Sequence, residues 1–524
     1  MSRYRIAGVA ALLVTVATYA NHFHNAFHFD DAHTIQNNAF VRSPANIPRF
    51  FVDPQTFSSL PSNQSYRPLA TATFAIDYWL GGGLDPLMFH VTSFSLFLIQ
   101  CAVLLVFYRR LLDRAKPGDA NRWIALAAAS WYALHPANAE TVNYLIARSE
   151  ILSTLGVVAA LTLFAGGGVA RRAYLYLIPA ALAVLSRESG AMFAPLLVVY
   201  IVLFEPDTSV RDAWPSFVVC FGIVFAGLRL ATTYSPGGTS RWHYLLTQPF
   251  VLLHYAFSLF FPVSLSADAQ WPLITDPRDP RLLIGLVFVA AMLAAAWLTS
   301  RRQETRPIAF GILWFFIALL PTSSLVPLSE PMNDHRMFFP FVGLILAVVW
   351  SLWLAIERRA SLSGERAAAT AAIAVLLVMA DGTRERNAVW HTEESLWLDA
   401  TIKSPDNGRG LMNYGVIQMD KGNFAVASRY FERALTLTPD YSYLHVNMGV
   451  LKAALGQPMA AERQFREALR DDPNNPVCYT QFARWLRSVG RTEEARLMAD
   501  AAVRLSPADV DARRMLDELS ALPR

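Results

Sequence analysis

The chain repeats the stretch GNFAVASRYFERALTLTP (residues 422–439) twice more toward its C-terminal end. The later versions are GQPMAAERQFREALRDDP at residues 456–473 and GRTEEARLMADAAVRLSP at residues 490–507. Each begins 34 residues after the one before, with Gly first, Ala at two fixed places and Pro last. Small residues let two helices cross closely, and proline stops the second helix. The stretch therefore predicts stacked helix pairs.

A 34-residue period with this pattern is typical of tetratricopeptide repeats, abbreviated TPR. We expect three TPR units over 407–508, preceded by a half-unit or connector at 382–406 and followed by a capping helix at 509–524. Such units stack into an α-solenoid with a concave, protein-binding groove. An array that only packs on the rest of the chain is the alternative.

The 381 residues before the repeats have a different composition. Over the 524 residues, 54% are hydrophobic and 16% charged, whereas soluble domains carry about 25% charge. Apolar runs near the length needed to cross a bilayer recur throughout this part. They exclude a purely cytosolic enzyme and predict an all-α membrane helix bundle followed by the solenoid. The eleven predicted spans are 5–21, 89–108, 122–136, 149–166, 172–186, 190–204, 214–231, 282–299, 307–321, 337–356 and 366–381.

The arginines orient this bundle. With a cytoplasmic N-terminus, the arginine-dense short loops fall inside, as the positive-inside rule requires. The first span stays uncleaved, residues 22–88 form a long external loop, and residues 249–265 form a re-entrant or interfacial segment. The TPR units are then external, which in a bacterial inner membrane means periplasmic. All but four of the 45 basic residues are arginine, a bias that base composition explains, so we infer no nucleic-acid partner.

Polar side chains gather on the predicted external face. Asp30 and Asp31 follow the first span; such a pair can bind Mg²⁺ or Mn²⁺, act as a general base, or cap a helix. Glu140, Tyr144 and Arg148 are spaced by four and would share one helix face, either as a site or as an ion pair that anchors a loop. Further candidates are Arg67, His135, Glu150, Arg187, Glu188, His335 and Arg336.

The external arginines suggest an anionic substrate. Guanidinium groups bind phosphate in a bidentate manner, and charged groups at membrane depth are functional candidates. An acidic pair with arginines at one membrane face predicts transfer of a group from a phospholipid-type donor.

The order of these motifs resembles a known family. Phe29-Asp30-Asp31, Arg67-Pro68-Leu69, His135-Pro136, Arg148-Ser149-Glu150, Arg187-Glu188 and Arg336, followed by C-terminal TPRs, are similar to the transmembrane-and-TPR O-mannosyltransferases of the GT-C superfamily. The resemblance implies a GT-C-type membrane domain over 1–381 and an inverting transfer of a sugar, expected to be mannose, from a polyprenyl phosphate to a protein hydroxyl.

The resemblance also implies residue roles. An acid of the first external loop would be the base, with Asp31 preferred over Asp30, and Arg148, Arg187 and Arg336 would bind the donor phosphate. The acceptor or a partner would bind the TPR groove. Two other hypotheses remain: a TPR membrane scaffold without enzymatic activity, and a polymerase or ligase of lipid-linked polysaccharide.

Overall fold

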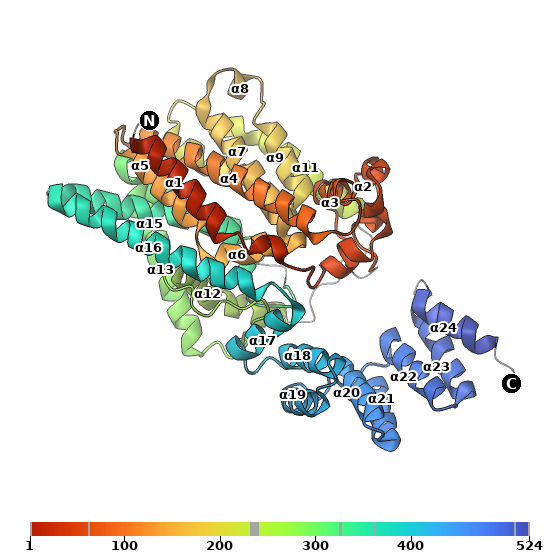
Figure 1. Cartoon of the computed structure of the whole chain (residues 1–524). Coiled ribbons are helices and arrows are strands. Elements are labelled where there is room, and N and C mark those ends of the chain that lie inside the picture. Colours follow the sequence, from red (N-terminus) through yellow and green to blue (C-terminus); the bar gives the residue numbers. More distant parts are fainter. Residues whose placement is uncertain are drawn as a thin grey trace. The chain divides into compact units, whose positions relative to one another are not determined.

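The computed structural model describes residues 3–60, 63–230, 240–323, 327–359, 362–507 and 510–521. Every regular element in these ranges is a helix (Figure 1). Residues 231, 508, 509 and 522–524 of the predicted elements lie outside the described residues. The chain divides into a membrane unit, Met1–Ala267 with Trp271–Thr392, and a repeat unit, Asp268–Gln270 with Glu393–Arg524.

Each of the eleven predicted spans coincides with a helix of the membrane unit. Among the described residues, seven helices are long and apolar enough to cross a bilayer: α1 (Arg3–Thr18, continuing to His24), α4 (Pro86–Ala115), α7 (Arg148–Gly166), α11 (Trp214–Leu230), α13 (Pro280–Ser300), α15 (Phe338–Arg359) and α16 (Leu362–Val389). The other four are shorter: α5 (Asn121–Ala133), α9 (Leu177–Ser186), α10 (Phe193–Phe204) and α14 (Arg306–Leu319). The described chain is therefore a multi-pass membrane helix bundle, and the full count of eleven crossings stays a prediction.

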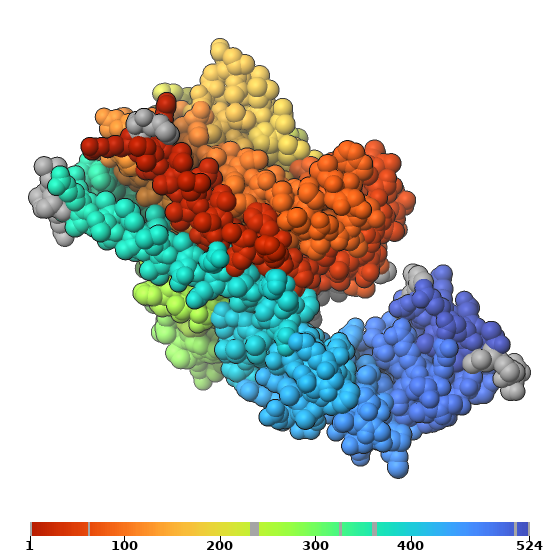
Figure 2. Space-filling view, in the orientation of Figure 1, coloured from red at the N-terminus to blue at the C-terminus, as the bar shows by residue number. Residues whose placement is uncertain are grey.

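Small residues set the closest helix contacts of the bundle. A Cβ on Gly311 of α14 would meet the carbonyl oxygen of Gly343 on α15, and a Cβ on Gly343 would meet the Trp314 side chain. Without a hydrophobic driving force between helices in lipid, such close backbone approach supplies much of the association energy. The first and last helices of the unit, α1 and α16, also pack against each other (Figure 2).

The long first loop, predicted to be external, is folded rather than extended. It contains α2 (Ile47–Phe50), several one-turn helices and α3 (Pro68–Leu80). Ile35, Val41, Phe50 and Phe57 form a buried core with side chains of α3, α4 and the turn at Leu145. This core holds the Asp30–Asp31 segment in a fixed place.

The segment predicted to lie at the interface begins inside a proline-containing helix and continues into irregular chain. α12 (Arg241–Ser258) carries Pro249 in its interior and is followed by irregular chain up to Asp279. Proline removes one helical hydrogen bond. The polar stretch after α12, which includes Asp268, belongs to the repeat unit instead.

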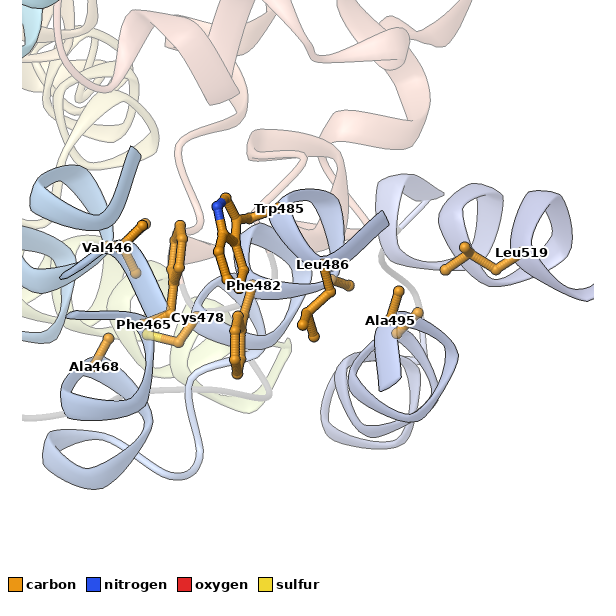
Figure 3. Close-up of a cluster of buried hydrophobic side chains, with 12 residues drawn as sticks. Val446, Phe465, Ala468, Cys478, Phe482, Trp485, Leu486, Ala495 and Leu519 are labelled. Atoms are coloured by element: carbon orange, nitrogen blue, oxygen red, sulfur yellow. The ribbon is translucent and has the colours of Figure 1, made fainter. Parts of the chain in front are cut away.

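The repeat unit is a series of antiparallel helix pairs. Its helices are α17 (Glu393–Lys403), α18 (Gly408–Asp420), α19 (Phe424–Leu437), α20 (Ser442–Ala454), α21 (Pro458–Asp471), α22 (Pro476–Ser488), α23 (Thr492–Leu505) and α24 (Val510–Ser520). The repeated glycines 422, 456 and 490 occupy the left-handed region with φ of 77°, 69° and 81° and end the first helix of each pair. The paired helices share a core in which Phe465, Phe482 and Trp485 stack (Figure 3).

Candidate functional site

The two adjacent acids of the first loop have opposite surroundings. Asp31 is fully buried, and its two oxygens accept backbone hydrogen bonds from His28 at 3.1 Å and Ile146 at 2.9 Å. Asp30 is half exposed, with a relative side-chain accessibility of 51%. Because geometry comes before pKa in choosing a base, the arrangement favours Asp30 over Asp31, which the sequence analysis preferred.

Asp30 is held by neighbours from two parts of the chain. His33 Nε2 lies 3.2 Å from its Oδ1, and the Asp30 amide donates to the Tyr144 hydroxyl at 3.2 Å. Desolvation alone would raise the pKa of Asp30, but hydrogen bonds from His33, Tyr144 and Asn63 outweigh it and hold the pKa below its ordinary value. Asp30 is therefore ionised at neutral pH.

Burial has the opposite effect on Asp31. It raises the pKa of the carboxyl to about 7, despite the backbone hydrogen bonds from His28 and Ile146. With both oxygens directed at the chain, Asp31 ties the first loop to the turn that precedes α7. That contact is structural.

Four charged residues from three helix termini form two ion pairs. Arg67, at the N-terminus of α3, lies 3.6 Å from Glu188, and Arg187 Nε lies 2.6 Å from Glu150 Oε2. Arg187 and Glu188 stand between α9 and α10, so the predicted notch exists, but they pair with other residues rather than with each other. The charges of Asp30, Glu150 and Glu188 all act on Arg67.

One donor of this group has no acceptor. The Nε of Arg67 is buried and makes no hydrogen bond to the described residues, and its partner Glu188 is half exposed at a long distance. Buried polar atoms are nearly always hydrogen-bonded, so this unsatisfied donor is a candidate contact for a ligand. An arginine whose ion-pair partner is distant and exposed can bind an anion. This group, Asp30, Arg67, Glu150, Arg187 and Glu188, is called the anion site below.

Arg148 does not belong to it. Its guanidinium is fully buried against Asp77, with NH1 to Oδ2 at 2.5 Å, and also donates to Ser93 and to the Phe89 carbonyl. The predicted continuous helix face of Glu140, Tyr144 and Arg148 was wrong, because α6 (Pro136–Asn143) ends before Tyr144, which has extended backbone. A Glu140–Arg148 pair is not formed.

A second polar group lies on α6 and the turn before α15. Glu140 accepts from His335 at 3.2 Å, and burial raises the pKa of Glu140 against the effect of that contact. Arg336 lies 3.5 Å from the Pro331 carbonyl oxygen. His135 caps α6, accepting from the amide of Ala137, and is buried. His135 therefore has a structural contact, while Glu140 and His335 form a partly exposed pair.

Sequence reasoning gave no separate role to three residues of this region. His33, three residues after Asp30, could have been found from that spacing. Tyr144 was noted only as part of a helix face, and Asp77, the partner of Arg148, carries no local signal. No group of three or more His, Cys, Asp or Glu side chains that could hold a metal occurs in the described part of the chain.

The repeat unit and the chain as a whole are each similar to known proteins. A family model described as tetratricopeptide repeat matches residues 408–441, which cover α18 and α19. The "Protein O-mannosyl-transferase Tmtc3" of Drosophila melanogaster is 24% identical over 86% of this chain and 57% of its own length.

The chain is similar to proteins named protein O-mannosyl-transferases. A second such protein, "Protein O-mannosyl-transferase F38B6.6" of Caenorhabditis elegans, is 25% identical over 83% of this chain and 64% of its own length. The chain thus spans about three-fifths of the length of these curated relatives. The crystal structure of ArnT from Cupriavidus metallidurans aligns with 95% of this chain and 79% of its own, at 16% identity and a TM-score of 0.34.

Proposed function

We propose that this chain is an integral-membrane glycosyltransferase that transfers a sugar from a polyprenyl phosphate to a hydroxyl group. The sugar is mannose and the acceptor a Ser or Thr of a protein, as the names of the O-mannosyl-transferase relatives suggest. The reaction takes place on the external face of a bacterial inner membrane, with a cytoplasmic N-terminus and a periplasmic TPR unit that binds the acceptor or a partner.

The observation that carries the proposal is that the charge of Asp30 acts on Arg67, the arginine of the anion site whose Nε has no acceptor among the described residues. Asp30 is exposed, ionised and fixed in orientation, as a general base must be. Arg67 offers an unpaired donor beside it. A base next to a phosphate-binding arginine is the arrangement that this transfer needs.

The reaction can be written with these residues. An acceptor hydroxyl loses its proton to Asp30 as its oxygen forms a bond to the anomeric carbon. The bond from that carbon to the phosphate oxygen breaks, and the lipid phosphate leaves with the electron pair. Attack opposite the leaving group inverts the anomeric centre. Arg67 and Arg187 stabilise the charge that develops on the phosphate.

No metal is needed in this scheme. The acid pair was a candidate Mg²⁺ or Mn²⁺ site, but the carboxylate of Asp31 is occupied by backbone amides. Glu140, His335 and Arg336 stay candidates for contacts with the substrate, and we assign them no chemical step.

The test is label transfer from polyprenyl-phosphate mannose to pooled exported polypeptides by the purified full chain. We expect Asp30→Asn to lower the rate roughly 100- to 10,000-fold, the contribution of a general base. Asp53→Asn is the matched control, since Asp53 lies in the same loop and caps a one-turn helix that Asn caps equally well.

Each outcome of the label-transfer test supports a different conclusion. An unchanged rate in Asp30→Asn would remove the assignment of the base. Label that enters only added glycans would favour the polysaccharide polymerase or ligase. No transfer from any lipid-linked sugar by folded protein would favour the scaffold, a hypothesis supported by the TPR match.

A further inference from the structure

The residue before Asp30 has an unusual backbone. Phe29 has a φ of 49°, in the left-handed region that side chains other than Gly rarely adopt. For such a residue this conformation costs roughly 1–2 kcal/mol, and it persists only where the surroundings enforce it. The strain here falls directly beside the exposed carboxylate.

Three aromatic rings enforce that conformation. The Phe29 ring packs edge-on against Tyr144 at 5.6 Å and against Trp390 at 6.0 Å. Tyr144 and Trp390 stack on each other at 5.8 Å with 25° between their planes. Trp390 is fully buried, and its carbonyl accepts from His28 at 2.6 Å. The Tyr144 ring therefore has little freedom to turn.

The fixed hydroxyl of Tyr144 contacts the Asp30 backbone. It accepts the Asp30 amide at 3.2 Å, and it is one of the groups that lower the pKa of the Asp30 carboxyl. A phenol carries one donor besides its acceptor lone pairs, so its O–H is available to the carboxylate while the oxygen accepts the amide. Burial raises the pKa of Tyr144 well above its ordinary value, so the phenol keeps its proton.

We propose that Tyr144, locked by Phe29 and Trp390, is a positioning residue that orients the Asp30 carboxylate toward the acceptor hydroxyl. The proposal rests on the function proposed above. Tyr144 does not touch the substrate; it fixes the carboxylate with one donor and leaves the exposed lone pairs free for the incoming hydroxyl. The strained Phe29 backbone is the means by which Asp30 reaches this hydroxyl.

The variant that tests this is Tyr144→Phe, which keeps the aromatic stack and removes only the hydroxyl. We expect kcat to fall roughly 10- to 100-fold, the worth of a hydrogen bond to a charged group, with little change in the KM of the donor. The acid limb of the pH profile of kcat moves to higher pH, since the phenol no longer favours the ionised carboxylate. His33, Asp31 and Arg67 are the other charged or titratable groups that act on Asp30, and they are unchanged.

The matched control is Tyr66→Phe. Tyr66 lies in the same loop and donates its hydroxyl to the Phe51 carbonyl at 2.9 Å, a purely structural bond. A wild-type kcat and acid limb in Tyr144→Phe would overturn the proposal, as would an equal loss of kcat in Tyr66→Phe. Both variants should unfold at wild-type temperatures.

A second readout is independent of turnover. The Asp30 carboxyl can be titrated by infrared difference spectroscopy, with Asp30→Asn spectra subtracted to isolate its band. We expect Tyr144→Phe to titrate at higher pH than the wild type. If no form transfers sugar and the titration still moves, the proposed function fails while the positioning of Asp30 stands. If the Asp30 carboxyl titrates at the same pH in Tyr144→Phe as in the wild type, Tyr144 does not position it.

Discussion

Two arginines from the same set of motifs, Arg148 and Arg67, have opposite surroundings. The Arg148–Asp77 pair has relative accessibilities of 0% and 1% and short contacts on every side. Glu188, the partner of Arg67, is half exposed and lies 3.6 Å from the guanidinium. The Nε of Arg67 has no acceptor among the described residues. The first pair is sealed between helices of the bundle, whereas the second has the partly open surroundings of the ligand contact that we propose. The charge of a motif residue therefore says less about its role than the exposure of its partner.

The largest effect on stability should come from breaking the buried Arg148–Asp77 pair. Arg148→Ala leaves the Asp77 carboxylate buried without compensation, which costs about 3–5 kcal/mol. We expect the variant to accumulate poorly and to unfold at much lower denaturant concentration in detergent. The double variant Arg148→Met with Asp77→Leu should recover much of the loss, because it removes both charges. A stability of Arg148→Ala within about 1 kcal/mol of wild type would contradict the comparison.

Breaking the Arg67–Glu188 pair should lower activity rather than stability. Arg67→Gln removes the donor that we propose binds the phosphate, so we expect kcat/KM for the lipid donor to fall roughly 100- to 1,000-fold. Stability should fall much less than in Arg148→Ala, because the Glu188 carboxylate that is left behind is half exposed. Arg49→Gln is the control, since Arg49 pairs with Asp53 at the surface of the same loop. If Arg67→Gln unfolds as Arg148→Ala does, the two arginines do not differ in role.

The features that the sequence predicted are those with local or periodic causes. The TPR unit follows from a 34-residue period, with a glycine at φ of 77° ending the first helix of its pair. The spans follow from apolar length. The ion pairs could not be predicted, because Asp77 and Arg148 meet only through the packing of α3, α4 and α7. The change of the preferred base from Asp31 to Asp30 also needed the structure, since the amide of Ile146 that occupies the Asp31 carboxylate comes from a distant turn.

The smallest of the expected effects separates the two acids by pH. Burial raises the pKa of Asp31 to about 7 in the folded chain, whereas an unfolded Asp titrates near 3.9. The folded state therefore binds the proton more tightly, and stability is greatest at low pH and falls as the pH rises through about 7. Asp30, whose pKa is lowered, cannot contribute to a loss in this window.

This gives a measurable slope. Between pH 5.5 and 7.5 we expect the wild type to lose about 2 kcal/mol of unfolding free energy from Asp31 alone. In Asp31→Asn that contribution should vanish, while Asp30→Asn should keep it and lose activity. Denaturant unfolding in detergent at the two pH values measures both. A slope that persists in Asp31→Asn and disappears in Asp30→Asn would reverse the roles, because the exposed carboxylate would then be the one that stabilises the fold and the buried one the candidate base.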